Sequence, residues 1–163
     1  LKNINVSQEG EYDYYSADST DHSGFELDAA FTFNQLWSLS SHGALVMNYF
    51  SDDKSLPNIP STLFNINFNY RVRKNMILFA HWKRVGHMYV DNANSEPGMI
   101  NPNGLLNMGT TYKWGGLDVL IKVNNVFDKL YATYGYGYEW DGFQAFHWPG
   151  ATRNSFVNIS YTW

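Results

Sequence analysis

The sequence contains no cysteine, no long run of apolar residues and no excess of positive charge. The absence of cysteine excludes disulfides, thiolate metal sites and cysteine nucleophiles. No segment approaches the roughly 20 consecutive apolar residues of a membrane-spanning helix. The net charge of -4 argues against a nucleic-acid partner, because such surfaces are normally basic. The 163 residues suffice for one domain, and that domain is not a bundle of membrane helices.

Aromatic residues, unlike cysteine and long apolar runs, are abundant in this sequence. The 12 tyrosines, 11 phenylalanines and 6 tryptophans make up 18% of the chain. This content suits the aromatic girdles of an outer-membrane barrel, or a sugar-binding face, better than an ordinary core. The mean hydropathy of -0.38 does not exclude a barrel, because lumen-facing polar residues dilute the lipid-facing ones.

Alternation of apolar and polar residues predicts about eight β-strands and no helix. In Leu63–Val72, Phe64, Ile66, Phe68 and Tyr70 fall on one face, and asparagines fall between them. The predicted strands are Lys2–Tyr14, Phe25–Asn34, Trp37–Phe50, Leu63–Val72, Met76–Tyr89, Leu105–Trp114, Leu117–Val126 and Ser155–Trp163.

Short and long connections alternate between these strands. The short ones are Asn34–Trp37, Arg73–Asn75 and Trp114–Leu117, and the long ones are Ser16–Gly24, Ser51–Thr62, Val90–Gly104 and Gly135–Thr152. Outer-membrane barrels have short periplasmic turns and longer extracellular loops. The sequence therefore predicts an all-β, antiparallel transmembrane barrel, with apolar side chains toward lipid and polar ones toward an aqueous lumen.

Two other all-β folds share this alternation. In a self-contained eight-stranded barrel with a structural or adhesive role, Lys2–Tyr14 would pair with Ser155–Trp163. In an aromatic-rich carbohydrate-binding sandwich, the apolar row of Leu63–Val72 would be buried under a second sheet. Two observations distinguish the three folds: which strand pairs with Lys2–Tyr14, and whether a second sheet covers the apolar row of Leu63–Val72.

Four short motifs carry a resemblance to a known family. Val123–Tyr131 is similar to an N-L-F-D-K-x-Y signature, Ser23–Leu27 to an R-G-x-E strand opening, Leu56–Pro60 to an L-P-x-V-P segment, and Pro149–Asn154 to a P-x-x-x-R-x lead into a terminal strand. In this order they resemble the C-terminal third of TonB-dependent outer-membrane receptors, over essentially the whole chain.

The resemblance implies part of an active transporter and not an enzyme. Family members are barrels of about 22 strands with a plugged lumen, so residues 1–163 would supply about eight C-terminal strands. Such receptors import a scarce ligand, such as a ferric siderophore, haem, cobalamin or an oligosaccharide, across the outer membrane of Gram-negative bacteria. The implied partners are outer-membrane lipid, the remaining barrel strands, the plug, the TonB energy complex acting through the plug, and a metal chelate or other small ligand.

The chain also departs from the family pattern. It shows neither a plug domain nor a TonB box, Trp163 stands where the family usually has Phe, and Ser23 precedes Gly24 where the family has Arg. Because Leu1 begins a strand-like segment without a basic or apolar leader, we expect either that a signal was removed or that this is a piece of a longer chain.

The candidate ligand-binding residues lie in the last long connection. Rigid aromatic side chains offer a large contact area and stack on flat chelates, haem-like rings or sugars. The predicted set is Tyr136, Tyr138, Trp140, Phe143, His147 and Trp148. The alternative role for these residues is an interfacial aromatic belt with loop packing.

A second set of candidates is structural. Asn125 and Asp128 are expected to hydrogen-bond backbone groups where a strand bends, and Phe127 and Tyr131 to anchor that bend. Arg153 and Trp163 belong to the family motifs that surround the last strand.

No catalytic, cofactor or metal site is predicted. The paired acids Asp52–Asp53 and Glu139/Asp141 lie in loops without a matching base. Of the five histidines, His22 and His147 lie on predicted extracellular loops, where they are the better candidates for touching a metal chelate.

Overall fold

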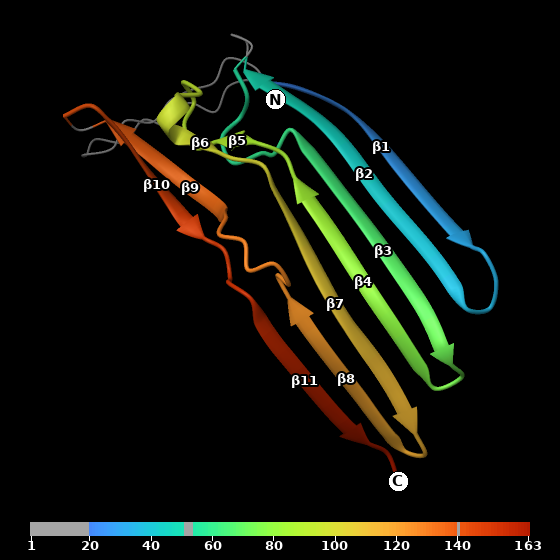
Figure 1. Ribbon diagram of the computed structural model, residues 1–163. Coiled ribbons are helices and arrows are strands. Elements are labelled where there is room, and N and C mark those ends of the chain that lie inside the picture. Colours follow the sequence, from blue (N-terminus) through green and yellow to red (C-terminus); the bar gives the residue numbers. More distant parts are fainter. Residues whose placement is uncertain (1–19, 51–53, 140) are drawn as a thin grey trace.

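The computed structural model describes residues 20–50, 54–139 and 141–163 (Figure 1). The predicted strand Lys2–Tyr14 lies outside these residues. The elements are β1 (Thr20–Thr32), β2 (Trp37–Phe50), β3 (Thr62–Arg73), β4 (Met76–Val85), β5 (Met88–Tyr89), a short 3-10 helix η1 (Glu96–Gly98), β6 (Met99–Ile100), β7 (Asn103–Trp114), β8 (Leu117–Asn124), β9 (Ala132–Glu139), β10 (Phe143–Pro149) and β11 (Asn154–Tyr161).

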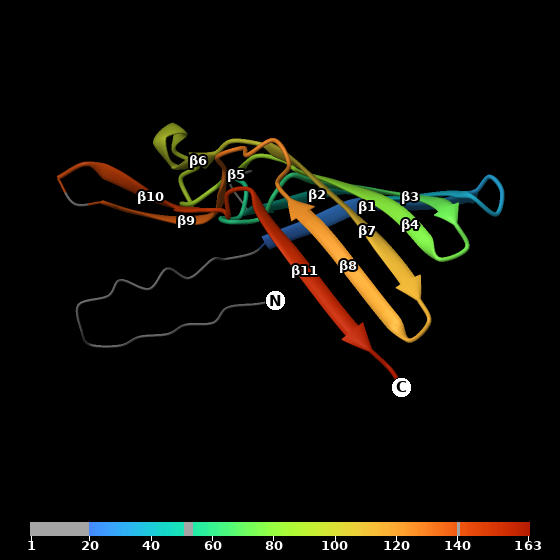
Figure 2. The same ribbon diagram turned by 60° about the horizontal axis from the view of Figure 1, so that its bottom comes forward.

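Seven strands form one antiparallel sheet in the order β1-β2-β3-β4-β7-β8-β11. They correspond to seven of the predicted strands, so the predicted all-β antiparallel architecture is confirmed. Within the described residues, β1 and β11 are the edges of this sheet, which is not closed into a barrel. Figure 2 shows it as a single curved layer, from which the β9–β10 hairpin extends at the end away from the C-terminus.

Three predicted segments were wrong by more than two residues. β1 begins at Thr20, inside the predicted loop Ser16–Gly24. The predicted strand Met76–Tyr89 is divided, because β4 ends at Val85 and β5 begins at Met88. Between them, the backbone at Gly86 lies against Thr62, where an added Cβ would be 2.5 Å from the Thr62 hydroxyl oxygen. The predicted loop Gly135–Thr152 contains most of the β9–β10 hairpin, and in β9 tyrosines alternate with glycines.

The three short turns are confirmed, and local chemistry explains them. The Asn34 side-chain oxygen accepts hydrogen bonds from the backbone N–H groups of Leu36 at 2.7 Å and Trp37 at 3.1 Å. Two residues, Gly115 and Gly116, connect β7 to β8, and Gly115 adopts a left-handed conformation with φ +58°. All three turns lie at the same end of the sheet (Figure 1).

The register aligns apolar side chains of neighbouring strands on one face of the sheet. Residues directly opposite each other share a face, so one row runs through Leu39, Phe68, Ala80, Met108 and Val123. The row displaced by one residue on the other face runs through Ser40, Asn67, His81 and Asn107. The predicted two-faced strands are therefore confirmed.

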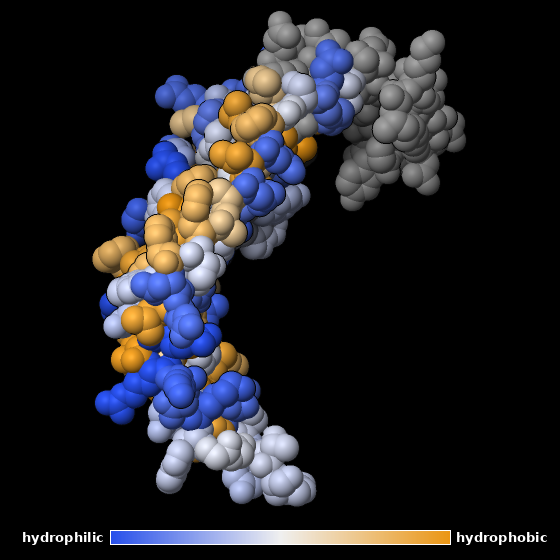
Figure 3. Space-filling model, turned by 90° about the vertical axis from the view of Figure 1, so that its right-hand side faces the viewer, coloured by the Kyte–Doolittle hydropathy of each residue, from blue (hydrophilic) through white to orange (hydrophobic). Residues whose placement is uncertain are grey.

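The apolar face has no protein cover among the described residues. Phe25 is 64% exposed, Ile121 43% and Ile159 65%. Apolar surface of this extent marks an interface with lipid or protein. The sandwich alternative is wrong, because no second sheet packs on this face within the described part of the chain. Figure 3 looks onto the β1 side and shows the curved molecule, with hydrophobic and hydrophilic residues interleaved.

The small buried core lies beyond the end of the sheet and not beneath it. Met88, Val90 and Ile100 are almost fully buried, and Ala132, Phe143 and Ala145 pack against them. This core fastens the β9–β10 hairpin to β5, β6 and η1, at the end of the sheet opposite the short turns (Figure 1). Within the residues that the structure describes, no helix is long and apolar enough to cross a membrane.

The two faces predict opposite responses to the same substitution at neighbouring positions. Phe68 lies midway along β3 on the apolar face, and Asn67 lies on the polar face. Phe68→Arg should lower the free energy of unfolding in phospholipid bilayers by about 2 to 4 kcal/mol, whereas Asn67→Arg should be close to neutral. Guanidinium titrations of the barrel folded into vesicles measure both, and equal losses would contradict the assignment of the faces.

Candidate ligand-binding face on the β9–β10 hairpin

The hairpin brings five aromatic rings onto one of its faces. Tyr134 pairs with Trp148, Tyr136 with Phe146, and Tyr138 with Gln144. We call Tyr134, Tyr136, Tyr138, Phe146 and Trp148 the aromatic face. Sequence reasoning found three of these residues and missed Tyr134 and Phe146, although the period-two spacing of the three tyrosines was a signal for a strand.

The rings of the aromatic face contact one another in a continuous series. The Tyr136 and Phe146 centroids are 5.4 Å apart with an interplanar angle of 15°, and those of Tyr138 and Phe146 are 5.6 Å apart with an angle of 6°. Trp148 lies 5.4 Å from Tyr136 and 5.6 Å from Tyr134. These separations fall in the range of favourable offset aromatic pairs.

The aromatic face is open to solvent and carries no formal charge on its five rings. Each ring is between 42% and 50% exposed. The Tyr138 hydroxyl lies 3.2 Å from the side-chain oxygen of Gln144, to which it donates a hydrogen bond. Such a surface can stack on a flat or ring-bearing ligand and can offer phenolic hydroxyls at its edge.

The rear face of the hairpin is packed against the buried core. Gly137 allows the Phe143 ring to lie close to the strand, since an added Cβ at Gly137 would come within 2.5 Å of that ring. Phe143 is partly buried against Met88, Val90 and Ile100. The structure therefore places Phe143 behind the aromatic face.

His147, another predicted ligand-binding residue, is not on the aromatic face. His147 pairs with Gly135 and alternates with Phe146 and Trp148, so it lies on the rear face with Phe143. Trp140 lies outside the described residues. His22 lies on β1, which belongs to a different sheet from the hairpin, and its ring nitrogen is 3.0 Å from the Thr20 hydroxyl.

The other histidines have protein partners. His42 lies 2.7 Å from the Asp28 carboxylate, and His81 lies 3.4 Å from both Asn65 and Asn107. Within the described residues, no three His, Asp or Glu side chains are grouped so as to hold a metal ion.

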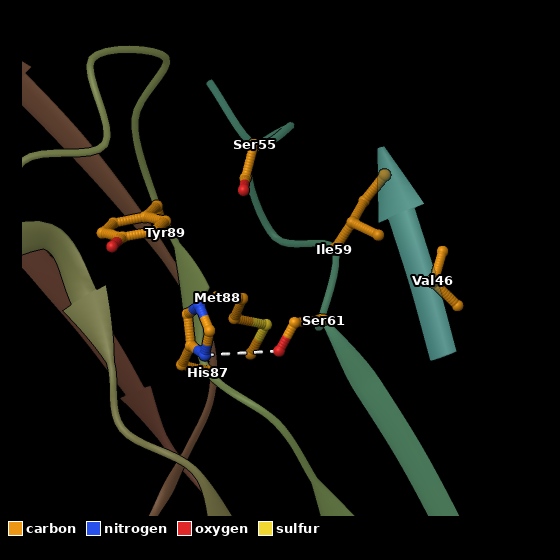
Figure 4. Close-up of a pocket in the computed structure, with 7 residues that line it drawn as sticks. All are labelled: Val46, Ser55, Ile59, Ser61, His87, Met88 and Tyr89. Carbon is orange, nitrogen blue, oxygen red and sulfur yellow. Dashed lines mark hydrogen bonds between the residues drawn. The ribbon is translucent and has the colours of Figure 1, made fainter. Parts of the chain in front are cut away.

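A small pocket lies near the loops at this end of the sheet (Figure 4). Its lining is Val46, Ser55, Ile59, Ser61, His87, Met88 and Tyr89. The His87 ring nitrogen lies 3.3 Å from the Ser61 hydroxyl. The pocket volume of about 90 Å³ is below the roughly 300 to 1,000 Å³ of small-molecule sites. The exposed aromatic face is therefore the better candidate for a bulky chelate.

Asn125 fixes the bend that leads from β8 to the hairpin. It is 3% exposed and has φ +49°. Its side-chain amide donates to the Lys129 carbonyl at 2.9 Å and to the Ala151 carbonyl at 3.2 Å, and its oxygen accepts from the Lys129 N–H at 2.9 Å. Asn125 thereby joins the segments that enter and leave the hairpin.

Neighbouring motif residues complete this bend. The Asp128 carboxylate accepts a hydrogen bond from the Arg153 N–H at 2.7 Å, at the start of the last strand. The Tyr131 ring lies against Gly150, and the Tyr131 carbonyl accepts the Gly150 N–H at 2.8 Å. Phe127 and Trp163 are 69% and 100% exposed and pack little against the described residues.

Comparison with known proteins decides the family. A model of the family described as TonB dependent receptor-like, beta-barrel matches residues 2–126. The chain belongs to this family of TonB-dependent receptor β-barrels. A search of curated protein sequences found no match.

Solved structures of such receptors share the fold. The ferric yersiniabactin uptake receptor FyuA from Yersinia pestis is 22% identical with a TM-score of 0.72, over 86% of this chain and 23% of that chain. The siderophore receptor PiuA from Acinetobacter baumannii is 18% identical with a TM-score of 0.72, over 88% and 22% of the two chains. The copper transporter OprC is 17% identical with a TM-score of 0.68, over 88% and 24%. The chain thus spans about a quarter of the length of these receptor barrels.

The contacts of Asn125 generate a stability prediction. Asn125→Ala removes three side-chain hydrogen bonds from a buried position. It also places alanine, which lacks the polar side chain of asparagine, in the left-handed conformation at φ +49°. We expect a loss of about 2 to 4 kcal/mol in the free energy of unfolding. The control is Asn124→Ala, which removes one bond to Asn154 and should lose about 1 kcal/mol. Equal losses in urea titrations would rule out the anchoring role of Asn125.

Proposed function

We propose that the chain forms the C-terminal part of the barrel wall of an outer-membrane receptor that imports a metal chelate, most simply a ferric siderophore. The apolar face of the sheet would contact outer-membrane lipid, and the polar face would line the lumen. A plug and the remaining strands would complete the receptor, and TonB would act through the plug. Family membership and the uncovered apolar face support this assignment.

The aromatic face is the single observation that carries the ligand proposal. It lies at the end of the sheet opposite the short turns, which is the extracellular end if the short turns are periplasmic. Its rings are stacked, half exposed and uncharged. Catecholate siderophores carry flat aromatic rings around the metal, and such rings complement this surface by stacking.

The solved relatives support a metal-bearing ligand. Those named above are described as a ferric yersiniabactin uptake receptor, a siderophore receptor and a copper transporter. Haem, cobalamin and oligosaccharides are the competing ligands, since each also stacks on aromatic rings.

Truncation of the aromatic face tests the proposal. In the receptor that contains this chain, Tyr136→Ala combined with Phe146→Ala should weaken binding of a ferric catecholate by at least about tenfold, because two stacked rings are lost. Quenching of protein fluorescence gives the affinity, and uptake of radioactive iron gives the transport rate. The probes compared are ferric catecholate, ferric hydroxamate, haemin, cobalamin and a malto-oligosaccharide.

The matched control is Trp114→Ala. Trp114 is 70% exposed and lies at the opposite end of the sheet, on the apolar face. This variant should leave affinity unchanged. Equal effects of the two variants, or no binding of any probe by the unmodified receptor, would refute the proposed function.

A further inference from the structure

Three asparagines at this end of the sheet make the same pair of hydrogen bonds, which we call an asparagine grip. In each grip, the side-chain oxygen accepts the backbone N–H of another residue, and the side-chain nitrogen donates to the backbone carbonyl of that same residue. The pairs are Asn58 with Gly135, Asn94 with Ser55, and Asn125 with Lys129. All three asparagines are in the left-handed region, with φ of 59°, 56° and 49°.

The Asn58 pair is the one that grips the hairpin. Its side-chain nitrogen donates to the Gly135 carbonyl at 3.0 Å, and its oxygen accepts the Gly135 N–H at 3.1 Å. Asn58 is itself held by its own N–H, which donates to the Tyr89 carbonyl at 2.7 Å. The loop before β3 is thus connected to a strand 77 residues further along the chain.

Gly135 is shaped for this contact. It is buried, and an added Cβ would lie 2.6 Å from both the Val90 side chain and the Phe146 carbonyl. Gly135 also lies between Tyr134 and Tyr136, two rings of the aromatic face. Movement of the Gly135 backbone would therefore move the rings on either side of it.

We infer that Asn58 is a positioning residue for ligand binding: it holds β9 in place and so fixes the aromatic face without touching the ligand. This inference rests on the proposed function. If only the ordered hairpin binds, the apparent affinity falls in proportion to the fraction of receptors in which the hairpin is ordered. Loss of the Asn58 grip should then lower the fraction of receptors with an ordered hairpin, and the affinity for the ligand should fall by the same factor.

The test compares Asn58→Gly with Asn94→Gly in the complete receptor. Glycine tolerates the left-handed conformation at both positions, so the two variants differ in which grip is lost. The hydrogen bonds of the Asn94 side chain join it to Ser55 and to the Asp91 carbonyl, and none of these bonds joins it to the hairpin. Asn58→Asp, which keeps the acceptor and loses the donor, serves as a second variant if Asn58→Gly does not fold.

Hydrogen exchange and binding are measured on the same samples. In Asn58→Gly, amide exchange of residues 132–139 should accelerate on the order of tenfold, with residues 63–72 unchanged. The affinity for a ferric catecholate, measured by fluorescence quenching, should fall by the same factor, and saturation with that probe should restore protection. Asn94→Gly should leave exchange in 132–139 at the unmodified rate.

Each outcome decides the inference. Unchanged exchange in 132–139, or faster exchange with unaltered affinity, would overturn it, as would an equal effect of Asn94→Gly. If the unmodified receptor does not bind ferric catecholate, the proposed ligand is wrong. Faster exchange in Asn58→Gly would then still establish Asn58 as the residue that orders the hairpin.

Discussion

The fold depends on one constraint: every backbone hydrogen-bonding group that faces hydrocarbon must find its partner within the protein. Antiparallel pairing from β1 across to β11 meets this constraint between the seven strands. In the proposed receptor, the remaining barrel strands would pair with the outer edges of β1 and β11. Its apolar face then needs no protein cover, because in the proposed receptor lipid takes that place. This explains how a chain with four buried hydrophobic residues among those described, Ala44, Met88, Val90 and Ile100, can form an extended, ordered sheet.

Beyond the end of the sheet the constraint changes, because the backbone there can bond to water. Order at this end comes from the small core around Val90 and from asparagine side chains that bind backbone groups of other segments, such as Asn58 with Gly135, Asn94 with Ser55 and Asn125 with Ala151. In the first two of these pairs, the side-chain amide supplies the donor and the acceptor that a backbone residue would supply in an antiparallel β-sheet. The aromatic face is therefore presented on a supported hairpin and not on a free loop, which would reduce the entropy lost in the proposed binding of a ligand.

Local rules explain what could be predicted from the sequence. The alternation in β3 and the turn chemistry of Asn34 and Gly115 act within a few residues, so the seven strands of the main sheet and the short turns between them were predicted, apart from some boundaries. The β9–β10 hairpin was missed because Gly135 and Gly137 are residue types that usually indicate a loop. In the structure, glycine is needed at these two strand positions because Val90 and Phe143 pack closely against the backbone there. The contact between Asn58 and Gly135 joins positions too far apart for any local pattern to reveal, and the rear position of Phe143 follows from a register that the sequence did not disclose.

The central claim is that one face of the sheet meets lipid and the other meets water. The most direct measurement is a spin-label scan of residues 63–72 in the receptor reconstituted into vesicles, with oxygen and a water-soluble nickel chelate as relaxation agents. The account predicts that contact with oxygen peaks at Phe64, Ile66, Phe68 and Tyr70, and that contact with the nickel chelate peaks at Leu63, Asn65, Asn67, Asn69 and Arg71. Low accessibility to both agents along the apolar row, or no alternation, would contradict it.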